Sequence, residues 1–95
     1  MRQMARSPNT ADLRAALAAE VRRGREKCEL SQEELAWRSG LHRTYISMVE
    51  RARRSLTIDS LERIAAALGT SASTLLARAE KSRQRGDSDE KKPTG

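Results

Sequence analysis

Apolar residues recur at intervals of three and four along most of this chain, the spacing that places them on one face of an α-helix. The stretch 58–68 shows the pattern most clearly, with Thr57 before it as an N-cap and Gly69 at its end. Its apolar face consists of Leu61, Ile64, Ala65 and Leu68. No stretch alternates apolar and polar residues as a strand does, so the pattern predicts an all-α protein.

The same spacing predicts a longer helix at each end of the chain. The first runs from about Ala11 to Glu29, with Thr10 as its N-cap. Its stripe is Leu13, Leu17, Val21, Gly24 and Cys28. The last is capped by Thr70 or Ser71 and fades near Arg83. A glycine inside the first helix costs up to about 1 kcal/mol relative to alanine, so we expect another helix to approach closely there.

The stretch 32–51 predicts two short helices joined by a sharp turn. Ser31 and Glu34 form a capping box that starts the first of them. Gly40 ends it, because a positive φ costs glycine little. A DNA-binding helix-turn-helix needs a small residue at the crossing, a turn glycine and two core aliphatics, which here are Ala36, Gly40, Ile46 and Val49. The alternative is an ordinary helical hairpin with a solvated face.

The second short helix, about Arg43 to Arg51, has one face suited to reading DNA. That face carries Arg43, Thr44, Ser47, Met48 and Arg51, opposite Ile46, Val49, Tyr45 and Glu50. Long donors and acceptors bond to base edges in the major groove, and a methionine can meet a thymine methyl. The basic loop 52–56 follows, and its Arg53 and Arg54 are placed to reach phosphates.

Charge indicates the kind of partner. The 95-residue chain has a net charge of +6 and allows one small domain with an aliphatic core. The excess is concentrated between residues 38 and 54, where Glu50 is the one acid. The arginines of that stretch are Arg38, Arg43, Arg51, Arg53 and Arg54. Double-stranded DNA is the expected partner.

Several function classes find no support. There is no signal peptide or long apolar run, so we expect a cytoplasmic protein without a membrane anchor. Neither Cys28 nor His42 has companions at metal-ligand spacing, and Cys28 is expected to pack as a small hydrophobe. No nucleophile–base pair or phosphate loop is visible. We therefore expect no enzyme activity, cofactor, metal or small-molecule ligand.

The sequence SQEELAWRSGLHRTYISMVERARRSLTIDSLERIAAALG, residues 31–69, resembles the lambda-repressor-like family of regulators, also called Cro/repressor or XRE type. Within it, LHRTYISMVER is most similar to the controller proteins of restriction–modification systems. The resemblance covers about Leu13 to Ala79 and implies a compact five-helix DNA-binding domain. Phage-type repressors and other lone-domain regulators share these features.

The resemblance also implies roles for single residues. Base reading falls to Arg43, Thr44, Ser47 and Met48, and Gln32 matches a position that meets phosphates. The DNA-backbone set then comprises Gln32, Tyr45, Arg51, Arg53 and Arg54. Arg25 and Glu50 match a pair that ties the first helix to the reading helix, and an unpaired carboxylate there would repel DNA. Two departures are Ala52, where the family usually has glycine, and Gly24, where it usually has leucine.

Three side chains near the reading helix have open roles. Trp37 is expected to lie across a neighbouring helix, rather than to stack on a DNA sugar or a partner protein. Two roles are equally open for the Tyr45 hydroxyl: a hydrogen bond to a DNA phosphate, or no contact with DNA. His42 is expected only to begin the reading helix.

The expected organisation is a flexible arm at residues 1–9, a helix-turn-helix domain at 10–84 and a disordered tail at 85–95. The expected function is a sequence-specific regulator that binds a palindromic operator as a homodimer and controls its own gene. An antitoxin-type protein is the alternative, although the polar tail lacks apolar anchors for a toxin.

The last helix is the expected dimer interface. Leu75 and Leu76 are neighbours, so they point about 100° apart on a helix. One of them should enter the core beside Leu61 and Leu68. The other should face outward, with Ala79 on nearby surface.

Overall fold

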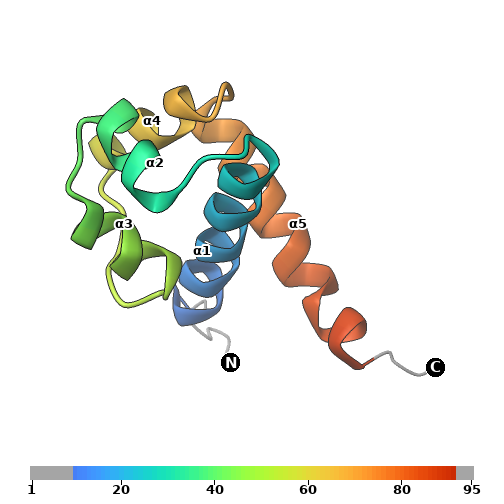
Figure 1. Ribbon diagram of the computed structural model, residues 1–95. Helices are drawn as coiled ribbons and strands as arrows, with labels where there is room; N and C mark the ends of the chain where they lie inside the picture. Colours follow the sequence, from blue (N-terminus) through green and yellow to red (C-terminus); the bar gives the residue numbers. More distant parts are fainter. Residues whose placement is uncertain (1–9, 92–95) are drawn as a thin grey trace.

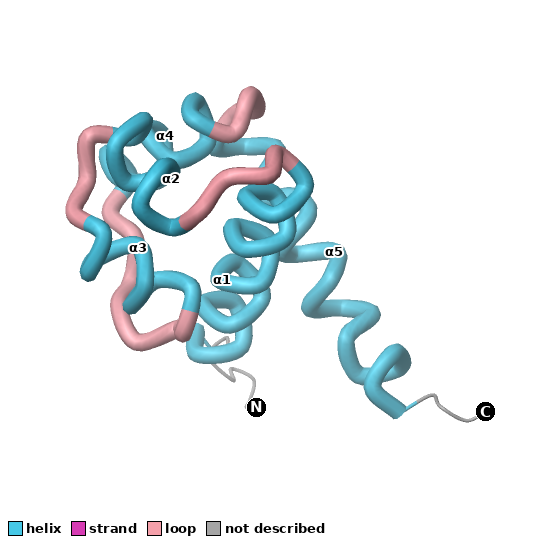
Figure 2. The backbone as a smooth tube through the Cα atoms, in the orientation of Figure 1, coloured by secondary structure: helices cyan, strands magenta, loops and turns pink. Residues whose placement is uncertain are grey.

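The computed structural model describes residues 10–91, which form five α-helices and no strand (Figures 1 and 2). The helices are α1 (Thr10–Lys27), α2 (Gln32–Ser39), α3 (Arg43–Glu50), α4 (Ile58–Ala67) and α5 (Ala72–Lys91). The all-α, five-helix prediction is confirmed. The predicted arm at residues 1–9 lies outside the described residues, as do residues 92–95.

Helix α1 stands between two groups of elements (Figure 1). It packs along α5 on one side and against α3 on the other, while α2 packs against both α3 and α4. The two halves of the helix-turn-helix, α2 and α3, therefore form one side of the molecule. Helix α5 lies on the far side of α1, and its C-terminal half projects past the other helices.

Every helix contributes an aliphatic side chain to one core. The largest fully buried side chains are Val21, Leu35, Ile46, Ile64 and Leu75. Burying each side chain of this size contributes about 1.5–3 kcal/mol. The half-buried Leu41 packs against this core from the turn between α2 and α3. The periodicity in the sequence therefore selected core residues of α2, α3 and α4 correctly.

The caps that the sequence predicted for α2 and for the start of α4 are formed, whereas α1 begins at Thr10 itself, the residue predicted to precede it. The Ser31 hydroxyl accepts from the Glu34 backbone N–H at 2.9 Å, and the Ser31 backbone N–H donates to the Glu34 carboxylate at 2.8 Å. Gly40 ends α2 with φ of 72°, in the left-handed region. Thr57 caps α4 by accepting from the Ser60 backbone N–H at 3.0 Å. These contacts fix where α2 and α4 begin and where the chain turns toward α3.

The glycine inside α1 has a packing reason. A Cβ atom built at Gly24 would lie 3.1 Å from Cδ1 of Leu68, the residue that ends α4. The expectation that another helix approaches closely at Gly24 is met only by a side chain from the end of α4. The contact comes from the Leu68 side chain, which occupies the volume that a side chain at position 24 would need.

Two expectations about the helix ends were wrong. Cys28 is exposed and does not pack as a small hydrophobe, because α1 ends at Lys27 and the chain leaves the helical stripe there. Helix α5 continues to Lys91 and does not fade near Arg83, so helical backbone extends into the predicted tail. The sequence after Ala79 consists largely of good helix formers, and the Glu80 and Arg83 side chains pair at 3.6 Å.

Candidate nucleic-acid interface

The reading helix α3 is anchored by its apolar side and leaves its polar side free. Ile46 and Val49 are buried, with Ile46 fully so. Arg43, Thr44 and Arg51 are exposed, and Ser47 and Met48 are half-buried. The predicted base-reading residues therefore lie together on the side of α3 away from the core, with Arg43 and Thr44 in the first turn. His42 occupies the N-cap position of α3, as expected, but its side chain makes no capping hydrogen bond.

The Arg25–Glu50 pair is present and connects three helices. The Arg25 Nε donates to one Glu50 carboxylate oxygen at 2.7 Å, and its Nη2 donates to the other at 3.0 Å. The Gln32 Nε2 donates to the same carboxylate at 3.1 Å. The Glu50 side chain is only 3% exposed and that of Arg25 13%. The network ties α1 and the start of α2 to the last residue of the reading helix.

The charges of Arg25 and Glu50 stabilise each other in this network. The hydrogen bonds to Glu50 raise the pKa of Arg25 above its ordinary value, in spite of partial burial. Arg25 also donates to the Leu30 carbonyl at 2.8 Å, so both ends of its guanidinium are held. The single acid of the basic stretch is thereby neutralised inside the protein. Gln32 uses one amide hydrogen on Glu50 and keeps the other for a further acceptor.

Tyr45 links the reading helix to the basic loop. Its hydroxyl donates to the Ser55 carbonyl at 3.3 Å, and the Arg54 guanidinium carbon lies 5.6 Å from its ring centroid. A tyrosine hydroxyl has one hydrogen and phosphate oxygens only accept, so Tyr45 can donate to a phosphate only by releasing Ser55. Arg53 and Arg54 are both exposed. The loop thus presents two arginines from a position fixed against α3.

The exit from α3 uses a left-handed residue. Ala52 has φ of 58°, a region that favours glycine. Its backbone N–H donates to the Val49 carbonyl at 2.9 Å, and that of Arg53 donates to Met48 at 2.8 Å. This pair of bonds is a Schellman ending. The backbone therefore turns as it would with glycine, although an alanine occupies the position.

The expectation for Trp37 was wrong. Its side chain is 84% exposed and does not lie across a neighbouring helix. The inner face of α2 is occupied by Leu35, Ala36 and Ser39, so Trp37 points to a side where no helix packs. It borders a shallow hollow with Glu33, Glu34 and Arg38.

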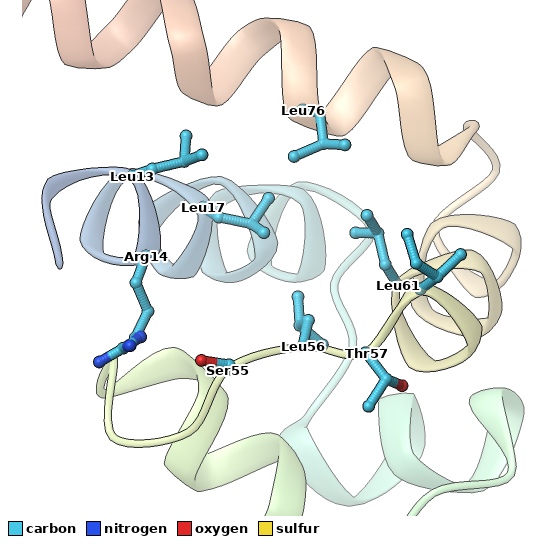
Figure 3. A pocket seen from close by; sticks show the side chains of 9 residues that line it. Leu13, Arg14, Leu17, Ser55, Leu56, Thr57, Leu61 and Leu76 are labelled. Atoms are coloured by element: carbon cyan, nitrogen blue, oxygen red, sulfur yellow. The ribbon is translucent and has the colours of Figure 1, made fainter. Parts of the chain in front are cut away.

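The predicted interface residues divide between the core and a groove. Leu75 and Ala79 are buried, so the expectation that Ala79 lies on the surface was wrong. Residues 75 and 79 are four apart and share the face of α5 that packs on the core. Leu76 is half-buried and faces an apolar groove of about 240 Å³ between α1, α5 and the segment before α4 (Figure 3).

Other residues of this groove were missed from the sequence. Its apolar lining is Leu13, Leu17, Leu56, Ile58, Leu61 and Leu76. Ile58 is 75% exposed, an unusual position for a large aliphatic side chain. The available signal was an isoleucine three residues before Leu61, which continues the apolar stripe of α4 beyond the core.

Comparison with known proteins identifies the family. Residues 21–75 match a family model described as helix-turn-helix. This chain belongs to that helix-turn-helix family. The matched range begins within α1 and ends within α5, so it contains the whole of α2, α3 and α4.

Individual relatives support the same family assignment. The control protein C.SmaI of Serratia marcescens is 51% identical over 67 residues, covering 70% of this chain and 80% of that protein. A hypothetical transcription factor of Neisseria meningitidis is 49% identical over 69 residues. That match covers 73% of this chain and 65% of the Neisseria protein, less than two thirds of its length. The crystal structure of the clp gene regulator ClgR from Corynebacterium glutamicum superposes with a TM-score of 0.76 at 32% identity, over 82% of this chain and 83% of ClgR.

These matches confirm the predicted family, the five-helix fold and a DNA-binding regulatory function. The matched proteins are transcription regulators and control proteins. Between residues 10 and 91, no helix combines the length and the apolar character needed to cross a bilayer. The same part of the chain holds no cluster of three or more His, Cys, Asp or Glu side chains arranged for a metal ion.

Proposed function

We propose that this regulator acts as a homodimer on a palindromic DNA operator, in the manner of a restriction–modification controller that regulates its own gene. The observation that carries the proposal is α3, which buries Ile46 and Val49 and leaves its basic and hydrogen-bonding side chains, with Met48 among them, on the opposite face. Control-protein relatives such as C.SmaI favour this class. A phage-type repressor of the same fold is the second candidate. A cytoplasmic location and the absence of catalysis belong to the proposal.

In this proposal each residue of the reading face makes its own kind of contact with DNA. Arg43 donates to the two acceptors of a guanine, and Thr44 and Ser47 bond to base edges or phosphate. Met48 meets a thymine methyl group. The DNA-backbone contacts come from Gln32, Arg51, Arg53 and Arg54, and Tyr45 joins them only if its hydroxyl releases the Ser55 carbonyl. These contacts surround α3, so they orient the helix in the groove.

A second copy of the chain is the proposed occupant of the apolar groove. One module of this size presents too few base contacts for a regulator's affinity, and two related by a two-fold axis double them. The groove lies beside α5 and leaves the polar face of α3 free. Leu76 and the exposed Ile58 are the expected contacts, with reading helices about 34 Å apart.

Two experiments test the proposal. Selection of bound sites from random duplexes should return two inverted half-sites, and a footprint should cover the promoter of the protein's own gene. Sedimentation should show dimers that Leu76→Glu dissociates, while the matched control Ala77→Glu, at an exposed position of the same helix, leaves them intact. A monomer at high micromolar concentration that binds one unrepeated half-site tightly would contradict the dimer. A toxin that copurifies would favour the antitoxin alternative.

A further inference from the structure

An arginine of α1 lies beside the basic loop, outside the helix-turn-helix. Arg14 and Arg54 line the same small hollow, together with Leu17, Ala18, Val49 and Leu56. Arg14 also borders the apolar groove next to Ser55. Figure 3 shows its side chain extending from α1 toward the loop that contains Ser55. The N-terminal half of α1 and the loop after α3 therefore bring two arginine residues to the border of one hollow.

These two arginines have no acidic partner among the described residues. The ion pairs formed there are those of Arg22, Arg23, Arg25, Arg63 and Arg83. The acid closest in sequence to the loop is Glu50, and Arg25 and Gln32 occupy its carboxylate. Arg14 and Arg54 are both exposed. Two like charges that share a hollow and lack a carboxylate favour an anion from outside the chain.

The loop also connects this pair to the reading helix. The Arg54 guanidinium lies over the Tyr45 ring, and the Tyr45 hydroxyl bonds to Ser55. Because Tyr45 belongs to α3, its contacts hold the charge of Arg54 beside the reading helix. Arg14 then adds a positive charge on α1, on the other side of the loop. Positive charges placed in this way suit the regularly spaced phosphates of a duplex.

We infer that Arg14 and Arg54 together form a phosphate-binding site that extends the DNA contact from α3 onto α1. The inference rests on the proposed DNA-binding function and adds a contact outside the helix-turn-helix. The site binds the sugar–phosphate backbone, so it strengthens binding without selecting sequence.

The test compares Arg14→Ala with the matched control Lys81→Ala. Lys81 is an exposed cation on α5, which lies on the opposite side of α1 from α3 (Figure 1). Both variants lower the net charge by one. Affinity for the selected duplex is measured by fluorescence anisotropy from about 50 to 200 mM salt. In a dimer, Arg14→Ala should flatten the log–log salt slope by about 1.8 units, while Lys81→Ala leaves it unchanged.

A flattening of that size makes the affinity loss over this fourfold salt range about twelvefold smaller. Affinity for cognate and unrelated duplexes should fall together, and Arg14→Lys should restore the slope. Thermal unfolding and sedimentation of Arg14→Ala should match wild type. If Arg14→Ala and Lys81→Ala behave alike while wild type binds its duplex, this inference fails and the proposed function stands. If Arg14→Ala acts only by dissociating the dimer, with an unchanged slope, the inference also fails.

Discussion

Removing Arg25 should destabilise the protein strongly, because it leaves a buried carboxylate with a single partner. Glu50 accepts from Arg25 at 2.7 and 3.0 Å and from Gln32 at 3.1 Å, and its side chain is 3% exposed. Breaking a buried pair on one side costs about 3–5 kcal/mol. Arg25 is itself 13% exposed, so water can enter the space that Arg25→Ala creates. We therefore expect the lower part of that range, a loss of about 3–4 kcal/mol in the free energy of unfolding.

A double-mutant cycle with Glu50→Ala separates the pair from its surroundings. The hydrogen bond from Arg25 to the Leu30 carbonyl is lost in both the single and the double variant, so it cancels. Urea unfolding should give a coupling free energy above about 2 kcal/mol. The matched control is the exposed Arg22–Glu26 pair at 3.4 Å, for which we expect under about 0.5 kcal/mol. Equal coupling for the two pairs would refute the reasoning. DNA affinity of Arg25→Ala, measured where the variant is still folded, should fall as well, because Glu50 then repels phosphate.

Three further outcomes follow from the site and the caps. Ala52→Gly relieves about 1–2 kcal/mol of left-handed strain and loses about 0.4–1 kcal/mol to unfolded-chain entropy. The midpoints of these ranges leave a net gain of about 0.8 kcal/mol, so thermal unfolding should shift up by about 3–6 °C. Gly69→Ala, at φ of 75° with nothing within 4 Å of the added Cβ, should shift it down. The Ser31 backbone N–H lowers the pKa of Glu34, so this stabilisation is complete above the ordinary glutamate pKa of about 4.3 and is lost as pH falls through the lowered value. The stability advantage of wild type over Glu34→Gln should thus vanish at low pH, and an advantage that is independent of pH would count against it. Arg43→Ala should cost about 1–3 kcal/mol on the selected site and relax one base preference, whereas Arg53→Ala should weaken all duplexes equally. Site selection repeated with each variant should show a relaxed base preference for Arg43→Ala and an unchanged preference for Arg53→Ala.

Features set by local spacing were predictable from the sequence. Gly40 and the Ser31–Glu34 box depend on residues within one or two turns, and both formed as expected. Ile46 and Val49 follow from helical periodicity alone. The two-helix unit that carries the reading face could therefore be placed before any tertiary contact was known.

Features that depend on which helix covers which face were not predictable. Trp37 was expected to lie across a neighbouring helix, and only the positions of α3 and α4 show that no helix between residues 10 and 91 covers it. Leu75 and Ala79 share one face of α5 and Leu76 lies on another, and the sequence does not say which face meets α1. Ile58 continues a core stripe, yet the core ends before it. These three features depend on packing between segments distant in sequence.

The contact between Gly24 and Leu68 makes two distant positions share one volume. A Cβ atom added at position 24 requires the Leu68 side chain, at the C-cap of α4, to move by a few tenths of an ångström, and Leu68 is followed by the turn into α5. The side-chain sizes at positions 24 and 68 are therefore coupled. A bulky side chain at position 24 would therefore act on α4 through its C-cap, at the point where the chain turns toward α5.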